Sequence, residues 1–267
     1  MKNVFLPFLV LLPLSCLSSP ISSDVAARNI SITEGETASY TASDYIQDGL
    51  VAMWDGIENA GLGIHDESAT SWVDLTGNNF DLTANTGMDF VLWGHSFATS
   101  KKNTGLIAYG DYIFRHRNLT IEIVSDSIIQ GSNLSILGIN TTDAQNSGVI
   151  ALRTALDTIF FSYQSYQTFV SYAFRNTHLF YSFVFDQNGT LDVYQQSSIF
   201  LQSPLSYFDV SVPEGNIVSF LGRSTTTQTF KPGLIGNFYS IRIYDRKLSQ
   251  EEIAYNNSID TIRFNLK

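Results

Sequence analysis

The chain has 267 residues, of which 44% are hydrophobic and 15% charged, a balance typical of a globular protein. A formal net charge of -10 with only 15 Lys and Arg residues excludes nucleic acid as an expected partner, because phosphate binding needs clustered cations, and it disfavours anionic polysaccharides. Abundant Phe and Tyr favour strands, so we predict one all-β domain.

The first 19 residues have the features of an export signal. Lys2 precedes an apolar core too short to span a membrane, and small residues follow. The single cysteine, Cys16, stands in a context that resembles a bacterial lipoprotein signal, in which it would be lipidated and become the first mature residue; Pro13 departs from the aliphatic residue usual there. Alternatively, Cys16 is removed with the leader. We expect an exported chain, either a lipoprotein of the cell surface or outer membrane, or a secreted protein.

Residues 20–46 are polar and lack periodicity, so we interpret them as a tether, with the domain proper over residues 47–267. Residues 49–54 form an apolar strand that ends at Asp55-Gly56. Trp54 and Trp72 lie in apolar surroundings and are expected in the core.

The middle of the chain reads as a series of short strands separated by turn residues. Residues 119–124 alternate strongly, and Glu122 is expected to face solvent. A hairpin is predicted around Asp186-Gln187-Asn188-Gly189, because Asn-Gly supplies the positive φ angles of a tight turn. Further strands are predicted at residues 134–139, 149–152, 158–163, 168–174 and 217–222.

The segment 233–253 predicts a strand followed by a helix. Its first half is dense in β-branched and aromatic residues, which is typical of a central strand buried on both faces. Ser249 and Glu252 are spaced as a capping box, in which the hydroxyl and the carboxylate satisfy free backbone amides. We therefore predict a short helix over residues 250–256.

Three segments match the sequence pattern of one known domain family. Trp72 to Leu82 reads W-x-D-L-x-G-N-x-x-x-L, similar to the opening segment of that family. The predicted hairpin matches at His178, Asp186, Gly189 and Tyr194, but Asn176 occupies the usual Trp position and Gln195-Gln196 replaces the customary Asn/Asp-Gly. The closing segment matches at Gly233, Ile235, Tyr244, Arg246, Leu248, Ser249, Glu252 and Ile253. By these three segments the chain resembles the bacterial laminin G-like, concanavalin A-like lectin and glucanase superfamily. The resemblance implies a two-sheet antiparallel jelly-roll sandwich with a short C-terminal helix.

Catalytic patterns are weak. Glycoside cleavage needs two facing carboxylates, conveniently placed at alternate positions of one strand, and we find no such pair. His65-Asp66-Glu67 offers imidazole beside two acids, but adjacent residues on a polar loop usually face water, and no nucleophile motif accompanies them. We do not expect an enzyme.

Calcium is the ion that the sequence favours, because oxygen-rich loops suit a hard cation. Candidate ligands are Asp55, Asp74 and Asn78, which flank two neighbouring turns, although they would serve equally as turn formers. Zinc is disfavoured, since the four His residues are scattered and the domain itself has no cysteine.

A sugar site needs an aromatic face to stack on ring hydrogens and amides to bind hydroxyls. Tyr163 and Tyr166 flank a predicted turn and are our preferred platform, with Gln164 and Gln167 as hydrogen-bonding groups. We expect a non-catalytic recognition module at the bacterial surface that binds a glycan, as the resemblance implies. A protein-protein interaction or adhesion module without sugar binding is the alternative, and a glycoside hydrolase comes third.

Overall fold

The computed structural model describes most of the predicted domain and none of residues 1–39. Its described residues are 40–84, 92–94, 98–100, 106–109, 118–129, 134–140, 151–155, 158–163, 166–171, 179–204, 217–220, 223–224, 230–231 and 235–266. Cys16 and the predicted export signal therefore lie outside the described residues. None of the described helices combines the length and the apolarity that a membrane span requires.

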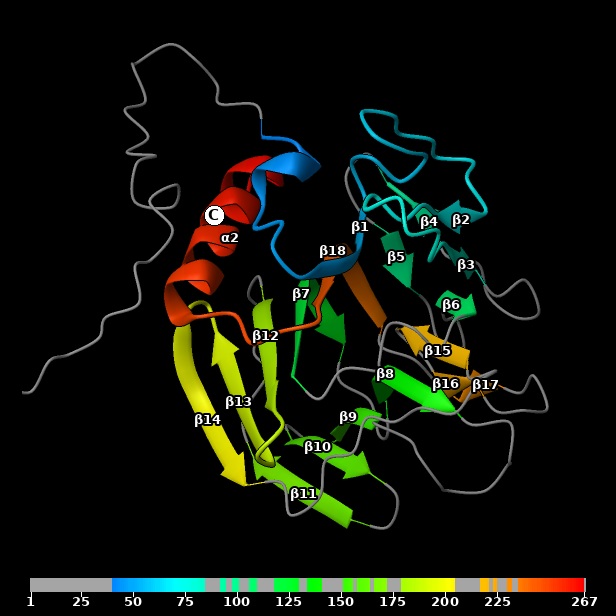
Figure 1. Ribbon diagram of the computed structural model, residues 1–267. Coiled ribbons are helices and arrows are strands. Elements are labelled where there is room, and N and C mark those ends of the chain that lie inside the picture. The colour runs from blue at the N-terminus through cyan, green and yellow to red at the C-terminus, as the bar shows by residue number, and fades with distance from the viewer. Residues whose placement is uncertain are drawn as a thin grey trace, which may run out of the picture. The chain divides into compact units, whose positions relative to one another are not determined.

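The described residues form two large antiparallel sheets and one C-terminal helix (Figure 1). The first sheet has the strand order β14-β13-β12-β7-β18-β5-β4, and β1 also pairs with β18. Its strands are β1 (Leu50–Asp55), β4 (Leu92–Trp93), β5 (Ala98–Ser100), β7 (Leu119–Ile129), β12 (Leu179–Asp186), β13 (Thr190–Gln195), β14 (Ser198–Pro204) and β18 (Ile235–Tyr244).

The second sheet has the order β11-β10-β9-β8-β15-β6-β3-β2, and a separate pair joins β16 (Arg223–Ser224) to β17 (Phe230–Lys231). Its strands are β2 (Ser71–Trp72), β3 (Leu82–Ala84), β6 (Leu106–Tyr109), β8 (Leu134–Asn140), β9 (Ala151–Ala155), β10 (Thr158–Tyr163), β11 (Tyr166–Ser171) and β15 (Ile217–Phe220). The long crossovers in both strand orders are typical of a jelly roll. The prediction of an all-β sandwich is confirmed.

The predicted closing strand, β18, is the most connected strand of the first sheet. It pairs with β7, β1 and β5. Phe238, Ile241 and Ile243 are fully buried, and so are Ser240 and Tyr244 among their neighbours. The prediction of a central strand buried on both faces is therefore confirmed.

Helix α2 (Gln250–Arg263) begins where the capping box predicts and ends seven residues later than expected. The Ser249 side chain accepts a hydrogen bond from the Glu252 backbone at 3.3 Å, and the Glu252 carboxylate accepts one from the Ser249 backbone at 2.8 Å. Tertiary contacts at Ile259 and Asp260, both fully buried, hold the additional turns in place.

The folded domain begins before residue 47. A 3₁₀ turn, η1 (Ala42–Asp44), lies beside α2 (Figure 1), and Tyr45 and Ile46 after it are buried. The Ile46 amide donates to Asn256 Oδ1 at 3.1 Å, and Tyr255 donates to the Asp44 carbonyl oxygen at 3.1 Å. The last residues of the predicted tether are therefore part of the domain.

Both predicted core tryptophans are buried. Trp54 and Trp72 have no exposed surface, and Trp54 Nε1 donates to the Phe80 carbonyl oxygen at 2.9 Å. Trp72 Nε1 donates to the carbonyl oxygen of Asp55, which ties β2 to the end of β1. Strands from both sheets meet at these two side chains, which places the N-terminal part of the core there.

Two hairpins connect β12, β13 and β14. In the predicted hairpin, Asp186 pairs with Thr190 across a three-residue loop, and Gly189 takes the left-handed position with φ 82°. The next turn contains Gln196 at φ 57° and Ser197 at φ 79°, two residues that tolerate such angles poorly. The departure from Asn/Asp-Gly at this tip therefore leaves a strained turn.

Candidate functional site

A row of polar side chains crosses three neighbouring strands of the first sheet and meets α2. Ser182 on β12 pairs with Glu122 on β7, and Glu122 pairs with Arg242 on β18, so the three residues lie side by side across the sheet. Glu122 accepts hydrogen bonds from Ser182 Oγ at 3.2 Å and from Arg242 Nε at 2.8 Å. These side chains are at most 2% exposed, so the row is closed off from solvent.

Helix α2 completes this row with two side chains one turn apart. Asp260 accepts two hydrogen bonds from the Arg242 guanidinium, at 2.7 and 2.6 Å, and a third from the Tyr45 hydroxyl at 2.7 Å. Asn256 Nδ2 donates to Glu122 Oε2 at 2.8 Å. The Arg242 guanidinium also lies 4.2 Å from the centre of the Tyr45 ring, within cation-π range.

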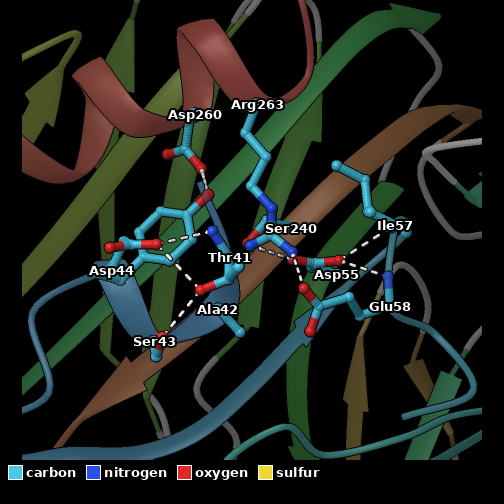
Figure 2. Close-up of polar contacts among 12 residues, drawn as sticks. Thr41, Ala42, Ser43, Asp44, Asp55, Ile57, Glu58, Ser240, Asp260 and Arg263 are labelled. Atoms are coloured by element: carbon cyan, nitrogen blue, oxygen red, sulfur yellow. Dashed lines mark hydrogen bonds and ion pairs between the residues drawn. The ribbon is translucent and has the colours of Figure 1, made fainter. Parts of the chain in front are cut away.

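A second ionic cluster joins the C-terminal end of α2 to the end of β1 (Figure 2). Arg263 lies 2.7 Å from Asp55 Oδ2 and 2.8 Å from Glu58 Oε1. The other oxygen of Asp55 accepts the backbone amides of Ile57 and Glu58, both at 2.9 Å. Asp55 is fully buried and Glu58 is 5% exposed, so this cluster is also shielded from water.

Burial and charge pairing oppose each other in both clusters. Desolvation raises the pKa of Asp55 to about 6, although Arg263 opposes the shift. It also raises the pKa of Glu122 against the opposing charge of Arg242. Burial alone would lower the pKa of Arg242, but Asp260 and Glu122 raise it well above its ordinary value. The arginines therefore remain charged, and each buried carboxylate depends on its arginine partner.

The expectation that Glu122 faces solvent is wrong. The alternation of β7 does turn Glu122 away from Ile121 and Ile123, but α2 covers that face of the sheet, as the contacts of Asn256 and Asp260 show. Glu122 and Asp260 are both held by Arg242, which satisfies their charge without water or substrate. This arrangement anchors a helix and offers no acid to a ligand in solution.

Sequence reasoning missed Arg242, Asn256 and Asp260 as a unit. The available signal was a charged residue in the middle of an apolar central strand, because a buried guanidinium requires carboxylate partners. Ending the predicted helix at residue 256 placed Asp260 outside it and hid that partner.

The three candidate calcium ligands each have protein partners. Asp55 pairs with Arg263, whereas Asp74 accepts the backbone amides of Met53 at 3.1 Å and Phe80 at 3.2 Å, as well as the Thr76 hydroxyl. Asn78 Nδ2 donates to the Val51 carbonyl oxygen at 2.8 Å. In the described part of the chain no group of three or more His, Cys, Asp or Glu side chains is placed to hold a metal ion. The structure does not test calcium binding at these residues, which would first have to give up these partners.

The predicted aromatic platform falls on the hairpin of β10 and β11. Tyr163 and Tyr166 are cross-strand partners at the ends of these strands, and the two residues of the predicted turn between them lie outside the described residues. Gln167 is the next residue of β11 and pairs with Ser162, whereas Gln164 lies outside the described residues. The backbone thus brings the two tyrosines together, and their role in binding stays a prediction.

In the third candidate set, residues 65–67, His65 and Asp66 both have hydrogen-bond partners in the protein. His65 Nδ1 lies 2.6 Å from the Gly56 carbonyl oxygen, and Asp66 accepts hydrogen bonds from the amide and the hydroxyl of Ser68. Asp66 and Glu67 are exposed, as expected for a loop whose acids face water.

The antiparallel sheets, their crossovers and the helix anchored on one sheet define the class as a concanavalin A-like β-sandwich. Among solved structures the chain is similar to Trypanosoma rangeli sialidase in complex with 2,3-difluoro-KDN, with a TM-score of 0.59, 14% identity and coverage of 80% of this chain and 33% of that one. It is also similar to the binding domain of botulinum neurotoxin DC in complex with rat synaptotagmin II, with a TM-score of 0.54, 11% identity and coverage of 81% and 52%.

A third similar structure is that of botulinum neurotoxin type C, a toxin that depends on interaction with two ganglioside molecules to enter cells; its TM-score is 0.52 at 10% identity. The chain spans about a third of the sialidase and about half of the neurotoxin chains. No protein-family model and no curated protein matches the sequence. At these identities the likeness establishes the fold, and ligand choice has to be argued from loops.

Proposed function

We propose that this chain is an exported, non-catalytic recognition module that binds a glycan through the end of the β10–β11 hairpin. The observation that carries the proposal is the direct pairing of Tyr163 on β10 with Tyr166 on β11. Two aromatic rings at one hairpin end supply the stacking surface that sugar rings require, and Gln164 and Gln167 add amide groups for hydroxyls.

Two of the similar structures support a glycan as the ligand class. The sialidase holds a sugar analogue, and the type C neurotoxin interacts with gangliosides. The charge of this chain restricts the class of glycan that it binds, since a net charge of -10 repels an anionic sugar unless cations line the site. We therefore propose that uncharged glycans bind more tightly than sialylated ones.

The non-catalytic part of the proposal is supported by the occupied carboxylates. Asp55, Glu58, Glu122 and Asp260 are each committed to an arginine and buried. A hydrolase needs one free acid and one free base or nucleophile facing a substrate. Incubation with the bound glycan should accordingly release no shorter product.

A protein partner is the second candidate, supported by the neurotoxin DC binding domain in complex with synaptotagmin II. An array that carries neutral and sialylated glycans separates the two candidates. Binding to a subset of glycans, abolished by Tyr163→Ala with Tyr166→Ala, supports the first proposal. An array without any signal above background would contradict it and leave protein recognition as the function.

A further inference from the structure

Two exposed aliphatic side chains stand close together in the loop between β1 and β2. Leu62 is 68% exposed and Ile64 is 57% exposed, the highest values among the large hydrophobic residues that the structure describes. They are two residues apart and separated by Gly63. We call this pair the apolar tip. Single exposed aliphatic residues are common, whereas contiguous apolar patches mark contact surfaces, and Leu62 and Ile64 are the candidate for such a patch in the described residues.

The backbone holds the apolar tip in a fixed shape. The Gly61 amide donates to the Glu58 carbonyl oxygen, and the Ile64 amide donates to that of Gly61, both at 2.9 Å. Gly61 at φ 127° and Gly63 at φ 74° occupy angles that other residues rarely adopt. The tip is therefore a hydrogen-bonded turn, so little conformational entropy is lost when it binds.

The base of the loop is fixed in the same way. The fully buried Asn59 side chain accepts the Asp66 amide at 2.9 Å and donates to the Asp66 carbonyl oxygen at 2.8 Å, so it closes the loop across seven residues. Glu58 is held by Arg263 at the end of α2 (Figure 2). The apolar tip is thus presented from a rigid base that is continuous with the ionic cluster of the core.

The charge beside the apolar tip is negative. Asp66 and Glu67 are exposed, and hydrogen bonds from Ser68 lower the pKa of Asp66, so that it stays ionised near neutral pH. Anionic phospholipid would be repelled by these carboxylates, and a second copy of the tip would bring like charges together. A surface that combines an apolar pocket with a rim of Lys or Arg is complementary to both features.

We propose that the apolar tip is a docking surface for a protein partner with an apolar pocket bordered by basic side chains. This surface lies outside the β10–β11 hairpin and is independent of the proposed glycan site. Failure of glycan binding would leave this proposal intact, and loss of the docking surface would leave the glycan array unchanged.

A selection from a phage-displayed library of random 12-residue peptides on the immobilised full-length chain tests the proposal. We expect enriched peptides that combine large apolar residues with Lys or Arg, and at least tenfold weaker binding of these peptides to the double variant Leu62→Ser, Ile64→Ser. Glu67→Lys should weaken the same peptides several-fold at low salt and less at high salt. Ile199→Ser, which alters an isolated aliphatic residue that is 52% exposed, is the matched control and should change nothing.

Three outcomes would overturn the proposal. One is a selection without enrichment, and another is a set of peptides that bind the double variant as well as the parent chain. The third is flotation with phosphatidylcholine vesicles that the double variant abolishes, which would assign the tip to a membrane. Unchanged melting temperatures of the variants show that lost binding does not reflect unfolding.

Discussion

Arg242 of β18 and Asp260 of α2 form a two-point ion pair in which both residues are at most 1% exposed, with nitrogen-oxygen distances of 2.7 and 2.6 Å. The guanidinium also binds Glu122 on the neighbouring strand. One side chain therefore joins the helix, the central strand and β7. This explains how a single C-terminal helix is fixed on a sheet that is polar at the point of contact.

Arg242→Met should destabilise the fold strongly. The substitution leaves Glu122 and Asp260 buried without a cation, and breaking a buried pair in this way costs about 3–5 kcal/mol of unfolding free energy. Urea denaturation at pH 7 should show this loss of unfolding free energy as a lower midpoint concentration of urea. The control is Lys247→Met, which removes the partly exposed pair with Asp186 and should cost at most about 1 kcal/mol. Equal midpoints for the two variants would show that the buried network contributes little.

Asp55→Asn should remove part of the pH dependence of stability. The folded-state pKa of Asp55, about 6, lies above its ordinary value of 3.8, so the folded protein binds this proton more tightly than the unfolded chain does. Asp55 therefore favours the folded state most below about pH 4, and this contribution, about 3 kcal/mol, is lost as the pH rises through 6.

The Asp55→Asn variant tests the direction of this pH dependence directly. Its amide oxygen can still accept the backbone amides of Ile57 and Glu58, while its side chain does not titrate. Unfolding free energies from pH 4 to pH 8 should show the parent chain losing stability relative to the variant as the pH rises. A difference that is constant across this range would contradict the assigned pKa.

The hairpin tip between β13 and β14 offers a stabilising change. Gln196 and Ser197 both have positive φ, and Asn-Gly is the pair that this turn prefers. Gln196→Asn with Ser197→Gly should therefore raise the unfolding free energy by about 1 kcal/mol or more, seen as a higher melting temperature. Gln187→Asn, in the loop of the preceding hairpin, is the control and should be neutral. A lower melting temperature would mean that the parent side chains make contacts worth more than the strain.

Calcium should leave the melting temperature unchanged. A cation that binds only the folded chain, present at a free concentration of one hundred times its dissociation constant, would add about 2.7 kcal/mol to the unfolding free energy. Asp55 already pairs with Arg263, and Asp74 already accepts backbone amides, so binding would first have to break these interactions. Melting with calcium and with chelator is the measurement, and a higher midpoint in calcium that Asp74→Asn abolishes would establish the predicted metal site.

The elements predicted best are those defined by local chemistry. The capping box at Ser249 and Glu252 fixes the start of α2, and Gly189 fixes the β12–β13 turn, because both depend on residues within three positions of each other. The end of α2 depends on Asp260, whose partner lies 18 residues away on another element. The local sequence pattern does not indicate which distant residue Asp260 contacts.

The error at Glu122 has the same origin. Alternation correctly separates its face of β7 from that of Ile121, but it cannot tell whether water or a helix covers the outer face. The prediction of a tether at Tyr45 fails for a related reason, since most of the residues before it are polar and its partner Asp260 is 215 residues away. The pairing of Tyr163 with Tyr166 is again a local feature, because only two residues separate them in the sequence. Whether these residues bind a sugar stays a prediction.

Isothermal titration calorimetry of the full-length chain with the strongest glycan of the array measures whether the β10–β11 hairpin binds a sugar. We predict that Tyr163→Ala with Tyr166→Ala reduces the affinity at least tenfold. Tyr163→Phe with Tyr166→Phe should largely keep it, because stacking needs the rings more than the hydroxyls. Equal affinities of the parent chain and the double alanine variant, with both proteins folded, would contradict a glycan site at this hairpin.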